Sequence, residues 1–242
     1  MASEFDDGAP SGRVGLAYAL PNGLLPYISY ATSFEPQVGS DIVGNALEPT
    51  EGRQVEVGLK YSPTAFEGLL TAAVYDLRQT NLTRPVSEVI DGEVRSGQRQ
   101  IGEVRSRGVE LSALATLPQG WDVEASYAYN DTEQQEGSNA GNALSNAPRH
   151  LANMWLSRDF ANGIRAGGGI RHVGERFGDQ ENTLALDSVT LLDLGASYTR
   201  GNVQASLNVS NLTDEAYVAS CSNFGCFYGE GRTVSAKVTY QW

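Results

Sequence analysis

The chain has 242 residues, of which 40% are hydrophobic and 27 are glycine, and its formal net charge at pH 7 is −12. This length suits one large domain or two small ones, and no apolar run approaches the roughly 20 residues of a transmembrane helix. The negative charge argues against a nucleic-acid partner, because a surface that binds phosphates is rich in Lys and Arg.

The N-terminal segment, Met1–Asp7, is polar and acidic. It lacks the basic start and the apolar core of a signal peptide. We therefore expect either a cytoplasmic protein or a chain from which the true N-terminus is missing. Residues 1–11 are expected to be disordered or to be the remnant of a loop, and residues 12–242 to form one unit.

Alternation of apolar with polar residues predicts β-strands that have one apolar face. The pattern is clear where Val55, Val57 and Leu59 alternate with Gln, Glu and Gly, and it recurs at 109–116 and 203–210. The eleven predicted strands cover about residues 12–20, 25–34, 53–62, 68–81, 99–117, 120–132, 148–159, 163–175, 187–199, 202–211 and 231–242.

Short and long connections alternate between these strands. The short ones contain Gly, Asn or Pro, as tight reversals require, whereas the long ones cover about residues 35–52, 82–98, 133–147, 176–186 and 212–230. An outer-membrane barrel has short periplasmic turns and long extracellular loops. The fold class expected is therefore all-β, an antiparallel up-and-down meander of about eleven strands.

Two apolar-faced architectures fit this alternation. In a wide membrane barrel the polar face lines a watery lumen, and in a soluble β-sandwich it meets solvent. The placement of all long loops at one end favours the barrel. The rows expected to face lipid are then Val55/Val57/Leu59, Val109/Leu111/Ala113 and Val203/Ala205/Leu207.

The chain ends on an aromatic residue of a strictly alternating segment, Arg232–Trp242. A terminal strand that closes an outer-membrane barrel commonly ends in this way. Tyr240 and Trp242 share the apolar face, and we expect them to form the C-terminal signal that the barrel-assembly machinery reads.

The two cysteines, Cys221 and Cys226, lie in a loop rich in Gly, Asn and aromatic residues. A local disulfide is favoured over two free thiols. The two histidines, His150 and His172, have no suitable spacing for zinc and no nucleophile pattern nearby. We therefore expect no enzymatic activity, no metal and no cofactor.

Seven stretches carry a family resemblance, in order, over the 203 residues from Tyr27 to Gly229. They are YISYATSFEP from Tyr27, LEPTEGRQVEVGLKY from Leu47, GEVRSRGVEL from Gly102, NAPRHLANMW from Asn146, VGERFGD from Val173, NVSNLTDEAYVAS from Asn208 and CSNFGCFYG from Cys221. Together they resemble a TonB-dependent siderophore receptor of the ferrichrome or ferric-hydroxamate type. The last stretch resembles the disulfide-tied final extracellular loop of such receptors.

The resemblance implies a ferric-siderophore transporter of the bacterial outer membrane, with this chain as the C-terminal half of a 22-stranded barrel. It implies membrane lipid and the TonB complex as partners, the latter through a plug domain that is missing here. The odd strand number departs from the even number of a closed barrel. Trp242 stands where the family usually has Phe.

The resemblance places the siderophore at the extracellular loops. Phe224, Phe227 and Tyr228 lie around the expected disulfide, and Phe177 lies in an earlier loop. Aromatic side chains offer broad contact to a bulky chelate, and a disulfide would order them before the ligand arrives. Two other functions stay open: a passive porin-like or structural barrel, assembled from two copies, and a soluble β-sandwich binding module.

Overall fold

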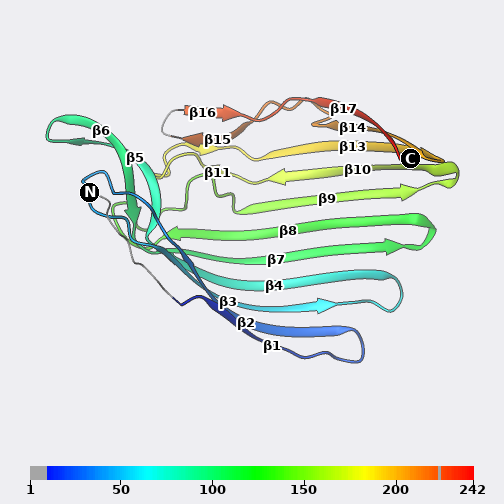
Figure 1. The fold of residues 1–242 in the computed structure, drawn as a ribbon, viewed down its shortest axis with the longest axis horizontal. Helices are drawn as coiled ribbons and strands as arrows, with labels where there is room; N and C mark the ends of the chain where they lie inside the picture. The colour runs from blue at the N-terminus through cyan, green and yellow to red at the C-terminus, as the bar shows by residue number, and fades with distance from the viewer. Residues whose placement is uncertain (1–9, 223–224) are drawn as a thin grey trace.

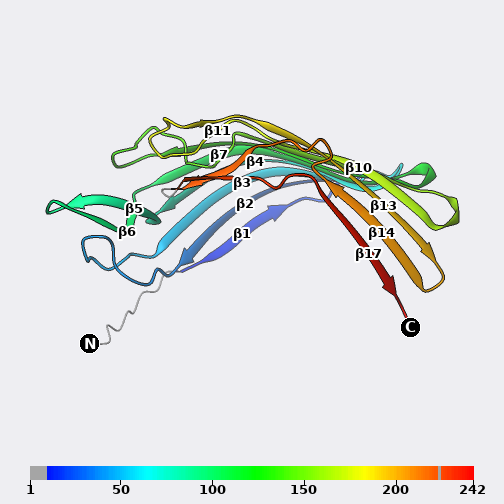
Figure 2. The ribbon, with the colours of Figure 1, turned by 90° about the horizontal axis from the view of Figure 1, so that it is seen from above.

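A computed structural model of the chain describes residues 10–222 and 225–242. Its main body is one antiparallel sheet of eleven strands, each paired with its neighbours in chain order (Figure 1). Figure 2 shows that the sheet bends into an arch. The strands are β1 (Gly12–Ala17), β2 (Leu24–Glu35), β3 (Thr50–Tyr61), β4 (Glu67–Thr80), β7 (Val104–Leu117), β8 (Trp121–Gln134), β9 (His150–Asp159), β10 (Ile164–Val173), β13 (Val189–Arg200), β14 (Val203–Ser210) and β17 (Thr233–Tyr240).

This arrangement confirms the predicted meander of eleven strands. Strands β1 and β17 form the two edges of the sheet, and neither pairs with a further strand of the described residues on its outer side. The long loops gather at one end of the strands and the short turns at the other (Figure 1).

The short turns are tight because residues with positive φ occupy their centres. The turns η1 (Pro118–Gly120) and η2 (Ala161–Gly163) place Gln119 and Asn162 at φ of 67° and 73°. The glycine that follows each also has a positive φ, of 77° at Gly120 and 78° at Gly163. Two successive positive φ values match the right-handed twist of the flanking strands.

The long loops, which were predicted as long connections between the strands of the sheet, hold three additional hairpins. They are β5 (Leu82–Ile90) with β6 (Glu93–Ile101), β11 (Arg176–Phe177) with β12 (Ala185–Leu186), and β15 (Val218–Ser222) with β16 (Gly225–Tyr228). The predicted strand at 99–117 was therefore wrong at its start, because residues 99–101 belong to β6. Asp91 and Gly92, at φ of 54° and 82°, close the β5–β6 hairpin.

Large apolar side chains lie in exposed rows along one face of the sheet. Ile28, Val57, Val74 and Val109 lie opposite one another on successive strands, and opposite residues of an antiparallel pair point to the same face. The first three are 49%, 47% and 51% exposed. An exposed apolar face of this size is stable against lipid rather than against water.

On the opposite face, three aromatic side chains lie across glycines that sit directly opposite them on the next strand. An added Cβ at Gly169, for example, would lie 2.5 Å from the indole ring of Trp155. Because these glycines have no Cβ, they leave room for the aromatic rings that lie over them. The pairs are Tyr27 with Gly58, Tyr75 with Gly108, and Trp155 with Gly169.

Buried apolar residues of the described chain gather at the loop end. Leu47, Val104, Leu186, Val189 and Leu191 are each at most 6% exposed. All five lie in the long loops or in the strand ends next to them. This small core holds the loops against one another and positions the site described next.

Candidate functional site

A cavity of about 760 Å³ lies among the long loops. Its volume falls in the usual range for small-molecule sites. Four segments contribute to its wall: strand β5, the β8–β9 loop, the turn between β11 and β12, and strand β15. The wall residues that matter for the chemistry are Arg84, Glu88, Asn146, Asp179, Glu181 and Cys221.

The predicted disulfide is confirmed. Cys221 on β15 and Cys226 on β16 lie opposite each other and are joined, with their Cα atoms 4.0 Å apart. Cys221 is buried and lines the cavity. The disulfide therefore ties the two strands of a hairpin of which one side forms cavity wall.

The aromatic residues proposed as ligand contacts take different places. Phe227 and Tyr228 lie on β16, 56% and 79% exposed, and do not line the cavity. Phe177 is half-buried on β11, next to Gly178, which does line it. Phe224 lies outside the described residues.

Asn146 joins three loops at the cavity wall. Its side-chain Nδ2 donates to the carbonyl oxygen of Cys221, and its Oδ1 accepts from the amide nitrogen of Cys221, each at 2.9 Å. Its own amide nitrogen donates to the carbonyl oxygen of Phe177 at 2.7 Å. The β8–β9 loop is thereby fixed to both β11 and β15.

A second asparagine makes the same kind of connection. Oδ1 of Asn182 accepts from the amide of Ala143 at 2.8 Å, and its Nδ2 donates to the carbonyl of Ala143 at 3.0 Å. Asn146 and Asn182 have φ of 56° and 57°, a conformation that Asn tolerates better than most residues. Neither contact is predictable from the sequence, because an asparagine in a loop does not reveal which distant backbone it contacts.

A buried arginine holds the disulfide hairpin in place. Arg176 on β11 is 7% exposed, and its Nη2 donates to the carbonyl oxygens of Val218 and Ala219 at 2.6 and 2.8 Å. Both acceptors belong to or adjoin the start of β15. The hairpin is therefore anchored to β11 by a charged group as well as by Asn146.

The charged side chains that line the cavity differ in their hydrogen-bond partners and in the direction of their pKa shifts. Glu88 accepts hydrogen bonds from Arg99 on β6, which lower the pKa of the Glu88 carboxyl. Asp179 accepts from the amides of Thr183 and Leu184 at 3.0 and 2.9 Å. Burial lowers the pKa of the Arg84 guanidinium, although the nearby charges of Glu181 and Glu88 act in the opposite sense.

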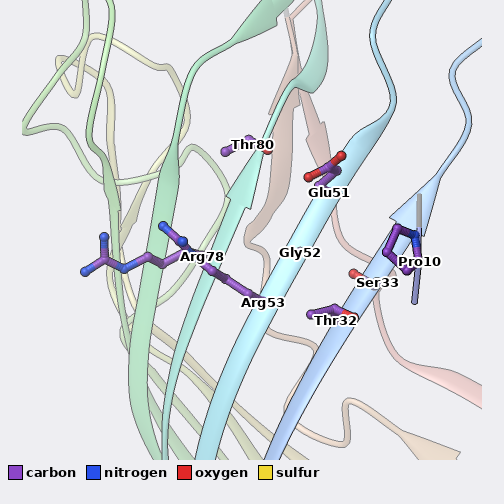
Figure 3. A pocket seen from close by; sticks show the side chains of 8 residues that line it. All are labelled: Pro10, Thr32, Ser33, Glu51, Gly52, Arg53, Arg78 and Thr80. Carbon is purple, nitrogen blue, oxygen red and sulfur yellow. The ribbon is translucent and has the colours of Figure 1, made fainter. Parts of the chain in front are cut away.

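A smaller hollow of about 290 Å³ lies at the loop end of β2, β3 and β4 (Figure 3). Arg53 and Arg78 lie opposite each other there and reach Glu103 at 3.3 and 2.9 Å. In Figure 3 both side chains extend to the same side, away from Pro10. Arg53 shares its face with Val55, so this hollow opens on the apolar side of the sheet and not toward the loop cavity.

The part of the chain that the structure describes holds no group of three or more His, Cys, Asp or Glu side chains placed to bind a metal ion. The loop cavity offers polar recognition: one half-buried arginine, ordered carboxylates and a wall fixed by asparagine amides. This arrangement suits a bound small molecule.

The sequence matches the model of the family described as TonB dependent receptor-like, beta-barrel, over residues 2–212. The ferrioxamine B receptor of Salmonella typhimurium is 37% identical over 250 residues, covering 98% of this chain and 35% of that relative. The ferrichrome outer membrane transporter/phage receptor of Escherichia coli K12 is 38% identical, with 98% and 32% covered. The chain thus spans about a third of the length of these curated relatives.

Solved structures share the fold. The siderophore receptor PiuA from Acinetobacter baumannii superimposes with a TM-score of 0.79 at 22% identity, covering 95% of this chain and 35% of that one. The ferripyoverdine receptor of the Pseudomonas aeruginosa outer membrane, bound to ferripyoverdine, gives a TM-score of 0.78 at 23% identity, with 97% and 33% covered. At these identities the likeness concerns the fold alone.

Proposed function

Because this chain belongs to the family of TonB-dependent receptor β-barrels, we propose that it supplies the C-terminal barrel half of a ferric-siderophore transporter. The barrel fold and the relatives place it in the bacterial outer membrane. The observation that carries the proposal is the loop cavity, which lies at the end of the sheet where the long loops gather. Relatives named as receptors for ferrioxamine B and as a ferrichrome transporter support the substrate class.

In this proposal each part of the chain has a task in uptake. The loops capture the ferric chelate at the mouth, and the walls fixed by Asn146 and Arg176 keep the cavity open before it arrives. The polar face of the sheet lines the path inward, because the apolar face is turned toward lipid. A plug domain outside this chain and the TonB complex supply gating and energy.

The aromatic residues around the disulfide have a separate task. Phe227 and Tyr228, which are exposed on β16, offer apolar area on the hairpin whose other strand lines the cavity, and Phe177 and Phe224 are further candidates for such contacts. Aromatic rings with polar tips suit a chelate with apolar and carbonyl edges. The barrel-assembly machinery would recognise Tyr240 and Trp242. The relatives are receptors and transporters, and we propose no chemical reaction for this chain.

Uptake of labelled iron tests this function. The intact receptor containing this chain is expressed in cells that lack their own siderophore receptors, with ⁵⁵Fe supplied as ferrichrome or ferrioxamine B. We expect saturable uptake in cells that contain TonB and none in cells that lack it. Uptake that persists without TonB, together with entry of unrelated small solutes, would instead support the porin-like alternative.

A further inference from the structure

The guanidinium of Arg84 has buried donors without acceptors. Its Nε and Nη1 are both out of contact with solvent and have no hydrogen-bond partner. These two nitrogens carry three of the five N–H donors of the group. A charged donor that is buried without an acceptor is costly. Nη2 is not among these closed atoms, so it is the nitrogen of Arg84 that an acceptor from outside the chain can reach.

Nearby carboxylates do not fill this position. Glu88 lines the cavity but is engaged by Nε of Arg99 at 2.8 Å. Asp179 is occupied by the amides of its own turn. Glu181 also lines the cavity but is exposed to solvent, and neither buried nitrogen of Arg84 bonds to it.

Arg84 is also the one cationic residue among the described residues that line the cavity. The remaining charged wall residues are Glu88, Asp179 and Glu181. An anionic ligand would be repelled by most of this wall and attracted at a single point. The charge pattern therefore fixes where a negative group of the ligand lies.

We infer that Arg84 binds a carboxylate on the periphery of the ferric chelate and that the cavity selects chelates carrying one. A carboxylate oxygen accepts a charge-assisted hydrogen bond from a guanidinium N–H, and Nη2 of Arg84 is the nitrogen that is not closed to solvent. The rest of the chelate then lies toward the opposite wall, at Cys221 and Asn146. The inference rests on the proposed function, because it specifies the substrate of the same cavity.

Two derivatives of ferrioxamine B give a matched pair of probes. The N-acetyl derivative is neutral at its free end, and the N-succinyl derivative carries a carboxylate there, while the iron-binding part is identical. Their dissociation constants are measured on the intact receptor in outer membranes. Charge-assisted hydrogen bonds predict that the succinyl chelate binds about 10- to 100-fold more tightly than the acetyl chelate.

Arg84→Gln should bring this ratio close to one and leave the affinity for the acetyl chelate within about threefold, since only the carboxylate contact is lost. Arg95→Gln is the matched control: Arg95 lies on the same hairpin but does not line the cavity, so the ratio should persist. Should Arg84→Gln fail to fold, as judged by heat-modifiable gel migration, Arg84→Lys should keep the preference but reduce it.

A ratio near one in the unaltered receptor, or a ratio that survives Arg84→Gln, would overturn the inference while leaving the proposed function in place. If neither chelate, nor ferrichrome, binds the unaltered receptor, the proposed function itself fails and the inference fails with it. The two failures are therefore distinguishable.

Discussion

Asn146 binds both main-chain polar groups of Cys221, a residue 75 positions later in the chain, through two hydrogen bonds of 2.9 Å. A primary amide can do this because it holds a donor and an acceptor side by side, as a neighbouring strand would. The side chain thus replaces one rung of a β-ladder. The Asn146 side chain therefore holds the cavity wall at Cys221, one of the two residues joined by the disulfide.

Replacing Asn146 by Asp keeps the acceptor and loses the donor, and should open β15 from the β8–β9 loop. We expect a loss of about 1–3 kcal/mol of local stability, because the buried carbonyl oxygen of Cys221 loses its donor. Hydrogen exchange at the Cys221 amide should quicken while thermal unfolding of the barrel stays the same. Asn202→Asp, in an exposed short turn, serves as the control, and equal effects at both positions would contradict the assigned role.

The apolar rows predict a face-dependent response to charge. Leu207 and Ser206 are adjacent on β14 and point to opposite faces. Leu207→Arg should destabilise the protein in a bilayer by about 2–4 kcal/mol, whereas Ser206→Arg should have little effect. Equilibrium unfolding from lipid vesicles measures both. Equal losses would mean that the apolar row does not face lipid.

Removal of the disulfide should affect binding more than folding. The Cys221–Cys226 bond closes a very small loop, and such a loop removes little entropy from the unfolded chain. In the double Ser variant we expect nearly unchanged barrel unfolding but weaker chelate binding, because Phe227 and Tyr228 become less ordered. Chelate titration with the intact receptor measures this, and unchanged affinity would refute the functional role of the bond.

The glycine under Trp155 should be difficult to replace. Gly169→Ala places a Cβ against the indole ring, and relief requires the ring to leave its position, at a cost of about 1–3 kcal/mol. Gly168→Ala, one residue earlier on the other face, meets the end of the Leu194 side chain at 3.1 Å and the carbonyl oxygen of Asp193 at 3.4 Å. It should be tolerated, because the flexible leucine can move aside. Stability and tryptophan fluorescence compare the two. Similar behaviour would show that Trp155 does not depend on this glycine.

The turn between β11 and β12 should loosen in acid. Desolvation would raise the pKa of the Asp179 carboxyl, but hydrogen bonds from Thr183 and Leu184 outweigh it and lower that pKa. A depressed folded-state pKa adds stability above the unfolded-state pKa and loses it as the pH falls through the folded-state value. Pepsin cleavage near Leu184 should therefore increase as the pH falls from about 4 to about 2.

Asp179→Asn is the control variant for this pH effect, because it lacks the titrating carboxylate. It should be cleaved readily throughout the same pH range, since an amide accepts fewer of these hydrogen bonds. If the unaltered turn resists pepsin equally at both ends of the range, protonation of Asp179 does not control it.

The eleven strands of the sheet were predictable because each has one apolar face and one polar face. Rows such as Val55, Val57 and Leu59 carry a period of two that no helix shares. The β5–β6 hairpin was missed although its signal was visible: the dipeptide Asp91-Gly92, between Ile90 and Glu93, is typical of a tight hairpin turn. The surrounding polar residues of β6 concealed the pattern.

The loop cavity was not predictable in the same way. Arg84 precedes a proline in a segment that reads as an ordinary loop, and the cavity that it lines is completed by three other segments distant in sequence. The contact of Asn146 with Cys221 likewise depends on how separate loops meet. Local patterns determine which residues form strands, but they do not determine which loop side chains meet above them.

The directions of the two edge strands, β1 and β17, limit which further strands could close this sheet into a barrel. Ten antiparallel pairings separate β1 from β17, so both edge strands run from the loop end to the turn end. Two copies joined edge to edge would meet in parallel at both seams, unlike antiparallel outer-membrane barrels. Antiparallel closure instead requires an odd number of further strands, the first and last of which run from turn end to loop end.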